Sequence, residues 1–108
     1  MSQDSHTQSP ISQIGDMLDD GLILTNLDGV IRSANPAAVR WFGENLTGQM
    51  IFAVINHPNI GDLFAKAADG AKRCEMRYEP TNNIHREFRM RLQRNGDQSV
   101  ALLFLDMT

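Results

Sequence analysis

Alternating and continuous apolar segments divide this chain into its expected elements. Apolar and polar residues alternate at 73–79 and at 86–94, a period typical of strands that bury one face and expose the other. Residues 22–25 and 100–105 are apolar at almost every position, so both are expected to be central strands covered on both faces. The pattern therefore predicts a sheet with two half-exposed strands and two buried ones.

Glycine-containing dipeptides mark two tight turns. Asp28-Gly29 is followed by a further strand at 30–34, which predicts a β-hairpin with the preceding strand. Glycine suits this turn because it adopts a positive φ at little cost. Asn95-Gly96 predicts a second hairpin, which joins the last two strands.

Three short helices are expected between the second and third strands. Asn35, which a proline follows, is a capping residue for a helix over 36–42. Residues 49–55 are apolar without strict alternation and predict a second, short helix. Asn59 is placed to cap a third helix over 60–69. Together these helices would cover one face of the sheet.

The amino-terminal segment predicts a tail and an amphipathic helix. Residues 1–9 are polar and rich in Ser and Gln, which predicts a disordered tail. In the following segment, 10–19, Ile11, Ile14 and Leu18 recur at helical spacing and form an apolar stripe. This helix is expected to cover the second face of the sheet. Because its stripe is narrow, a second protomer would complete the cover.

These elements predict an α+β fold built on a five-stranded antiparallel sheet. The first and last strands are apolar on both faces, so they are expected to lie side by side in the middle of the sheet. The half-exposed strands then follow the last strand outward, which gives the spatial order 2-1-5-4-3.

Two motifs in this order of elements resemble those of PAS domains in sensor kinases. Residues 20–38 follow the pattern with which such domains open: Asp-Gly, apolar strand, Asp-Gly turn, strand, and an Ala-Asn-Pro helix start. The last three residues, Asp106 to Thr108, are similar to the Asp-x-Thr motif that ends these domains. The resemblance covers residues 12–108 and implies a PAS fold for a domain spanning 10–108.

The resemblance implies a sensory and regulatory module of a two-component histidine kinase. Asp106 and Thr108 would form the exit through which a signal reaches a kinase phosphoacceptor domain on the carboxyl-terminal side. Ile11, Ile14 and Leu18 would join two copies into a homodimer. The module itself would not be an enzyme. It would be cytoplasmic, either free or as the cytosolic part of a membrane-anchored kinase.

A third segment, Val54-Ile-Asn-His-Pro58, is similar to one in PAS domains of phosphate-regulon sensor histidine kinases. For that type, the resemblance implies control by accessory regulatory proteins rather than by a small molecule.

Large apolar side chains are candidates to line a ligand pocket, which in PAS domains lies between the sheet and the short helices. The candidates are Trp41, Phe42, Phe52, Ile55, Phe64, Met76, Met90 and Leu102. They bring no converging polar group, so the alternative that they simply fill the core stays open. A ligand bound there would be small and largely hydrophobic.

No cofactor, metal or catalytic residue is predicted, although a haem-binding or other small-ligand sensor is kept as an alternative. Haem-binding PAS domains use a histidine near the third helix, and His57 lies just before it, but its Asn-His-Pro context favours a turn. The cysteine motif of flavin-binding relatives is absent, and Cys74 is expected to be a core residue. A small isomerase with a curved sheet is disfavoured, because no carboxylate falls on the apolar face of a predicted strand.

Charge is distributed unevenly along the 108 residues, whose formal net charge is −3. Residues 1–31 contain five Asp and no Lys or Arg, whereas 72–94 contain seven of the ten basic residues. The basic segment is either a solvated face or a contact surface for an acidic partner or a second copy. Nucleic acid is not an expected partner, because no aromatic residues are interleaved there. The longest apolar run, 100–105, is far shorter than the ~20 residues that a membrane helix needs.

Overall fold

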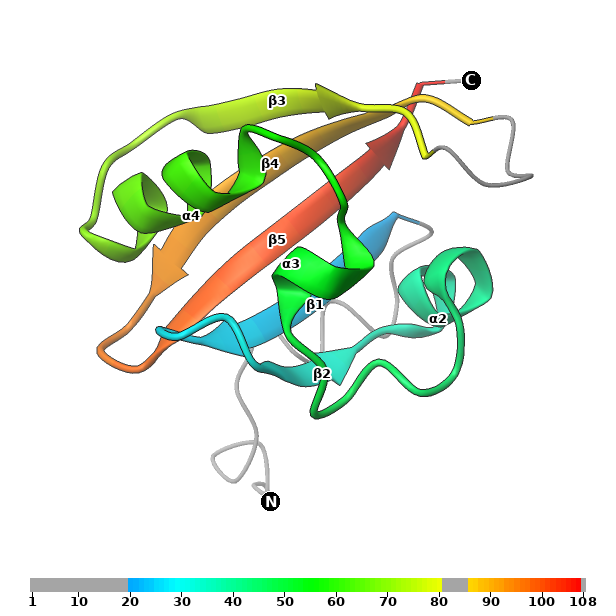
Figure 1. The fold of residues 1–108 in the computed structure, drawn as a ribbon, viewed down its shortest axis with the longest axis horizontal. Helices are drawn as coiled ribbons and strands as arrows, with labels where there is room; N and C mark the ends of the chain where they lie inside the picture. The colour runs from blue at the N-terminus through cyan, green and yellow to red at the C-terminus, as the bar shows by residue number, and fades with distance from the viewer. Residues whose placement is uncertain (1–19, 81–85, 108) are drawn as a thin grey trace, which may run out of the picture.

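The computed structural model describes residues 20–80 and 86–107, which form an antiparallel sheet and short helices (Figure 1). In chain order the elements are β1 (Gly21–Asn26), β2 (Ile31–Ala34), α2 (Pro36–Phe42), α3 (Ile51–Val54), α4 (Ile60–Ala68), β3 (Cys74–Tyr78), β4 (Phe88–Asn95) and β5 (Ser99–Asp106). The predicted tail, the helix over 10–19 and Thr108 lie outside the described residues. No described helix is long and apolar enough to cross a membrane.

The strand order is β2-β1-β5-β4-β3, and every neighbouring pair is antiparallel, which confirms the predicted sheet. The first and last strands lie side by side in its middle, with Gly21 opposite Phe104 and Thr25 opposite Val100. Their register places Ile23 beside Leu102 on the inner face. Both of these side chains are fully buried, as expected for the centre of the core.

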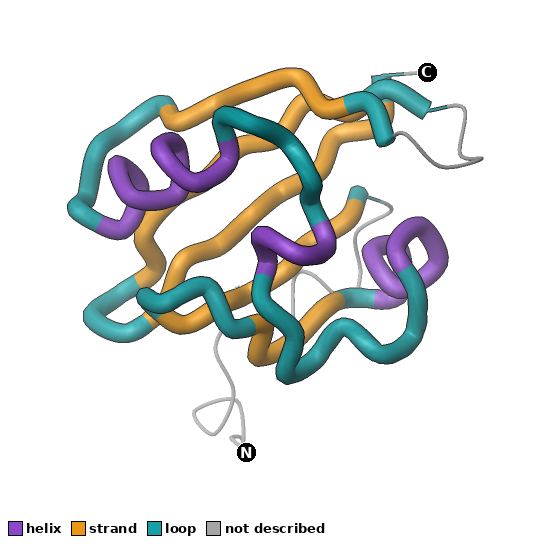
Figure 2. Tube along the Cα trace, in the orientation of Figure 1, coloured by secondary structure: helices purple, strands orange, loops and turns teal. Residues whose placement is uncertain are grey.

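The helices α3 and α4 cover the inner face of this sheet, while α2 lies beside the start of β1 (Figures 1 and 2). Strand and helix side chains meet between the layers in one continuous core. Its most deeply buried large members are Ile23, Ile31, Leu46, Ile51, Ile55, Phe88, Met90, Leu92, Leu102 and Phe104. The core therefore lies between the inner face of the sheet and the helices α3 and α4.

The two half-exposed strands show the predicted alternation. In β3, Cys74 and Tyr78 are buried while Glu75 and Arg77 are exposed. In β4 the inward-facing side chains are likewise buried and the outward-facing ones exposed. Side chains on adjacent positions of a strand point to opposite faces, so the sheet has an apolar inner face and a charged outer one over these strands.

The outer face of the central strands is apolar, as their sequences predict. Leu22 and Ala101 are buried there, whereas Leu24, Leu103 and Leu105 are only partly buried among the described chain. The helix predicted to cover this face is not among the residues described, so its position stays a prediction.

The first and third helices begin at the predicted residues, but only the first has the predicted side-chain cap. Oδ1 of Asn35 accepts a hydrogen bond from the Ala38 backbone N–H at 3.0 Å, which caps α2. The predicted cap of α4 by Asn59 is wrong, because that side chain makes no capping hydrogen bond. Instead, the Asn59 N–H donates to Nδ1 of His57 at 3.0 Å, so the histidine side chain holds the turn that precedes the helix.

The second helix is shorter than its predicted span of 49–55, because the backbone before it pairs with a strand. The Ile31 N–H donates to the Gln49 carbonyl at 2.8 Å, and the Gly48 N–H donates to the Ile31 carbonyl at 2.8 Å. Val30 and Met50 form an isolated antiparallel bridge beside these bonds. This segment therefore extends the sheet edge before α3 begins.

The last hairpin has a longer turn than its Asn-Gly dipeptide alone suggests. Asn95 pairs with Ser99, so residues 96–98 form a three-residue connection. Gly96 still adopts a positive φ of 75°. Arg94 braces the turn, because its guanidinium donates to the carbonyls of Gly96, Asp97 and, across the layer, Ala68 of α4.

Candidate functional site

The carboxyl-terminal end of β5 holds a charged and aromatic cluster, here called the exit junction: Trp41, Arg86 and Asp106. Asp106 is the last residue of β5 and pairs with Phe88 in the sheet. Its Oδ2 accepts a hydrogen bond from Nη1 of Arg86, which forms an ion pair. The Arg86 guanidinium lies over the Trp41 ring, 5.8 Å from its centroid. The carboxylate that ends the sheet is thereby connected to a side chain of α2.

Backbone contacts hold the chain beyond β5 in the same direction. The Met107 N–H donates to the Glu87 carbonyl at 2.8 Å, which continues the β4–β5 ladder past the last strand residue. Asp106 is partly buried, with a quarter of its side chain exposed. Together, the ion pair and this hydrogen bond fix the course of the chain where it leaves the sheet.

The aromatic part of the exit junction is packed tightly against the sheet. The Trp41 ring centroid lies 4.9 Å from that of Phe88, in a tilted arrangement. On the other side the indole covers Gly21, where an added Cβ would lie only 2.9 Å from Cζ3 of Trp41. Glycine at the start of β1 therefore provides the space that the tryptophan occupies.

Asn35 ties the start of α2 to the start of β1. Its Oδ1 accepts from the Leu22 N–H at 2.8 Å as well as from Ala38, and its Nδ2 donates to the Asp20 carbonyl at 2.8 Å. The Asn35 backbone N–H also donates to the Leu22 carbonyl at 2.9 Å. Because α2 is held to β1 at one end and carries Trp41 at the other, a displacement of this helix would move the exit junction.

The eight candidate pocket residues all lie in the core or pack against it. Trp41 and Phe42 pack near the exit junction, where Phe42 lies 4.9 Å from Phe104 between ring centroids. Phe52 packs on Phe64 at 5.3 Å beside the other helices. Ile55, Met90 and Leu102 are fully buried, Phe64 is nearly so, and Met76 is partly buried. A ligand pocket lined by this set stays a prediction.

His57 and Tyr78 meet where α4 begins. Their ring centroids are 6.5 Å apart in an edge-on arrangement, and His57 is partly buried. Burial raises the pKa of the Tyr78 phenol above its ordinary value of 10.0, while a backbone hydrogen bond with Asn56 acts in the opposite direction. The phenol is therefore neutral over the physiological range.

Cys74 is buried, and its Sγ lies 3.6 Å from the Ala71 carbonyl oxygen. This agrees with its expected place in the core. Within residues 20–80 and 86–107, no group of three or more His, Cys, Asp or Glu side chains converges in a way that could hold a metal ion.

Sequence reasoning singled out Asp106 but missed its partners. Arg86 is one of seven basic residues in its segment, and no local pattern distinguishes it from the others. The register supplies the signal, because Phe88 lies opposite Asp106 and brings the preceding residues to the end of β5. That register became known only with the structure.

No known protein family matches this sequence, and no curated protein is significantly similar to it. Solved structures with the same fold are found at low sequence identity. A domain of a sensory box sensor histidine kinase/response regulator from Geobacter sulfurreducens is 15% identical, with a TM-score of 0.72, over 98% of this chain and 100% of that chain. The PAS domain of the HTR-like protein from Haloarcula marismortui is 16% identical, with a TM-score of 0.65, over 95% of this chain and 99% of that chain.

A third similar structure is the Aer2 receptor from Vibrio cholerae, described as a dual PAS-haem oxygen sensor. It is 16% identical, with a TM-score of 0.63, over 82% of this chain and 95% of that chain. At such identities the likeness concerns the backbone arrangement and not the ligand or output of any one protein. The strand order, the helices on the inner face and these structural neighbours agree that the chain has the fold of a PAS domain.

Proposed function

We propose that this chain is a sensory and regulatory PAS module of a two-component histidine kinase. In this role it dimerises and passes a signal from its core to a kinase region on the carboxyl-terminal side, and it works in the cytoplasm. It performs no reaction itself. Solved sensor-kinase domains with the same fold support the assignment.

The exit junction is the observation that carries this proposal. Asp106 ends a central strand, is paired with Arg86, and is linked through Trp41 to a helix of the inner layer. A change in the packing of α2 would alter the ion pair and hence the direction in which the chain leaves the sheet. Tilt or rotation of a following helix is a rigid-body switch of a known kind.

A chimeric kinase tests the proposal. This chain would replace the PAS domain of a well-behaved histidine kinase, and autophosphorylation would be measured with wild-type Asp106 and with Asp106→Asn. We expect Asp106→Asn to shift kinase output severalfold, because it weakens the bond to Arg86 while preserving side-chain size. Asp97→Asn is the matched control, since Asp97 lies in the exposed turn at the far end of β5. Equal output from all three chimeras would contradict the proposal.

A haem sensor is the second candidate, prompted by the haem-binding structural neighbour. The histidine best placed for it fits poorly. Nδ1 of His57 accepts a hydrogen bond from a backbone N–H, so in the neutral ring the proton is on Nε2 and no lone pair is left for iron. An ultraviolet–visible spectrum of the purified chain decides the matter, because a Soret band would establish haem and a flat visible trace would exclude both haem and flavin.

The phosphate-regulon type and control by an accessory protein remain proposals that rest on the segment from Val54 to Pro58. This segment forms the end of α3 and the turn that His57 holds before α4.

A further inference from the structure

The outward-facing side chains of β3 and β4, together with Lys72 and Arg73 just before β3, form a basic surface, here called the cationic ribbon. Its members are Lys72, Arg73, Arg77, Arg89 and Arg91. Two of the five are neutralised, because Arg77 pairs with Glu87 at 2.6 Å and Arg91 pairs with Glu75 at 3.4 Å. Among the described residues, the other three cations have no ion-pair partner. This uncompensated charge lies on one face of a chain that is acidic as a whole.

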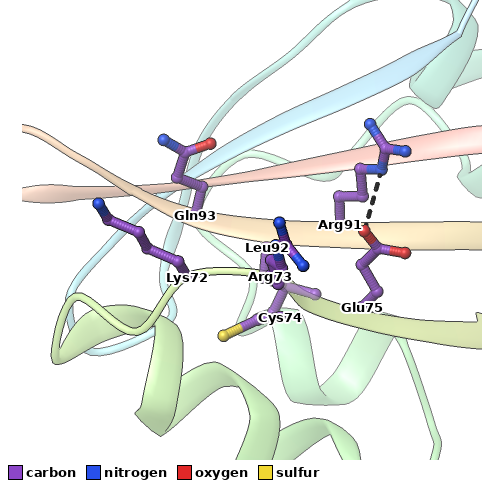
Figure 3. A pocket seen from close by; sticks show the side chains of 7 residues that line it. All are labelled: Lys72, Arg73, Cys74, Glu75, Arg91, Leu92 and Gln93. Atoms are coloured by element: carbon purple, nitrogen blue, oxygen red, sulfur yellow. Dashed lines mark ion pairs between the residues drawn. The ribbon is translucent and has the colours of Figure 1, made fainter.

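A hollow of about 360 Å³ opens at one end of the ribbon (Figure 3). It is lined by Lys72, Arg73, Cys74, Glu75, Arg91, Leu92 and Gln93. The side chains of Cys74 and Leu92 are buried in the core, and the other five lining residues carry charged or amide groups. Small-molecule pockets are lined mainly by apolar side chains, so this lining suits polar side chains of a partner better.

Arg73 adopts an unfavourable backbone conformation at this hollow. Its φ is +61°, and no other described residue except glycine has a positive φ. Arginine has no local hydrogen bond that favours this region, whereas glycine would adopt it at little cost. Strained backbone concentrates at binding sites, where the side chain it presents has a use.

Two arrangements along the ribbon indicate the chemistry of its partner. Arg77 and Arg89 lie directly opposite each other across β3 and β4. Glu87 pairs with Arg77, so Arg89 is the member of this like-charge pair that has no ion-pair partner among the described residues. On the other side of β4, Arg91 and Arg89 lie opposite Leu103 and Leu105, which are partly buried. A partner that complements this surface would therefore present carboxylates to the ribbon and apolar side chains beside them.

We propose that the cationic ribbon is the docking surface for an acidic, leucine-containing segment of a protein partner. The proposal rests on the proposed function, in which an accessory regulatory protein is an expected partner. Its carboxylates bind Lys72, Arg73 and Arg89, and its apolar side chains contact the parts of Leu103 and Leu105 that stay exposed beside the predicted amino-terminal helix. A nucleic acid fits less well, because the ribbon exposes no aromatic ring for stacking.

Peptide binding to the 108-residue chain tests the proposal. The probe is a fluorescein-labelled peptide of alternating Glu and Leu, and its anisotropy is followed at low salt. We expect binding that the double reversal Lys72→Glu with Arg89→Glu weakens by at least about tenfold, since several exposed charge pairs are lost together. High salt should have the same effect, because the screening length falls to ~3 Å at 1 M.

Matched variants distinguish binding at the cationic ribbon from a general effect of net charge. Arg40→Glu with Lys66→Glu produces the same change of net charge on exposed helix positions, and it should leave peptide binding within about twofold of wild type. Arg73→Gly should weaken binding and also raise the thermal midpoint, because glycine relieves the strain. This second variant stays informative even if the double reversal does not fold.

Three results would overturn the proposal. They are an absence of peptide binding to wild type, equal weakening by the two double variants, and tighter binding of a single-stranded oligonucleotide or of phosphatidylserine vesicles than of the peptide. None of these depends on kinase output or on dimerisation. Failure here would therefore leave the sensory role standing, and failure of the chimera would leave the docking surface standing.

Discussion

Asn35 connects three segments of backbone through one buried side chain. It caps α2, accepts from β1 and donates to the residue before β1. Removing the amide leaves the Leu22 N–H without this acceptor in a buried place, and an orphaned buried donor costs more than an ordinary helix cap. The position therefore contributes to the fold well beyond helix initiation.

We expect Asn35→Ala to lower the free energy of unfolding by ~2–4 kcal/mol, the sum of a lost cap and lost buried hydrogen bonds. Asn59→Ala is the matched control, because Asn59 also precedes a helix but makes no capping bond, and it should cost less than ~0.5 kcal/mol. Urea unfolding of both variants measures the difference. Equal losses would contradict the assigned role.

Tyr78 is the only tyrosine of the chain, so its ionisation can be followed directly by phenolate absorbance. Burial raises its pKa above 10.0, so the titration midpoint should lie above that value in the folded protein and return to it in urea. The folded state holds the proton more tightly than the unfolded state. The phenol's contribution to stability is therefore full below pH 10 and declines as the pH rises toward the raised pKa. A midpoint at or below 10 in the folded chain would rule out this burial effect.

The β1–β2 hairpin and α3 pack as a unit through the turn at Gly29. The Ile51 N–H donates to the Gly29 carbonyl at 2.8 Å, which places the start of the helix on the turn. Oδ1 of Asn26 accepts from the N–H groups of Asp28 and Val30 and closes the loop from inside. An added Cβ at Gly29 would lie 2.7 Å from Cε2 of Phe52. Glycine is therefore required at position 29 both for its positive φ and because a Cβ would clash with Phe52.

Two glycines with almost the same φ allow the cost of the backbone conformation to be measured apart from the cost of the steric clash. Gly29 has a φ of +96° and Gly70 a φ of +95°, but nothing lies within 4 Å of a Cβ added at Gly70. We expect Gly70→Ala to cost about 1 kcal/mol for the strained φ alone, and Gly29→Ala to cost ~2–4 kcal/mol because Phe52 must also move. Thermal unfolding of the two variants tests this. Similar midpoints would mean that the turn and α3 are not tightly packed.

Elements that depend on local pattern were predictable from the sequence, and those that depend on register were not. Strand order followed from the doubly apolar segments, because only central strands need cover on both faces. The side-chain cap of α4 was mispredicted, because Asn59 stands at the predicted position but makes no capping hydrogen bond, and its N–H donates to His57 two residues earlier. The Arg86–Asp106 pair joins positions that are twenty residues apart, so only the β4–β5 register brings them together.

At the scale of the whole molecule, the two faces of the sheet differ in how far other parts of the chain cover them. The inner face is covered by helices, while the outer face presents partly buried leucines of β1 and β5 beside the cationic ribbon. Leu24, Leu103 and Leu105 form the apolar part. A partly covered apolar surface of this kind is typical of an interface.

Light scattering tests the proposed homodimer. We expect wild type to have twice the mass of the chain at micromolar concentration. We expect Ile14→Asp to be a monomer, because burying a charge in the apolar stripe of the predicted amino-terminal helix costs more free energy than dimerisation releases. Gln13→Asp adds the same charge on the polar side of that stripe and should leave the dimer intact. A monomeric wild type that Ile14→Asp leaves unchanged would contradict dimerisation through this helix.

Because Gly21 lies opposite Phe104, the two ends of the described domain meet at a single rung of the ladder. Backbones paired in this way are about 5 Å apart, so preceding and following parts of a longer polypeptide would emerge as close neighbours. A rotation or sliding movement of the preceding part would reach the following part through β1 and β5, without deforming the helical layer.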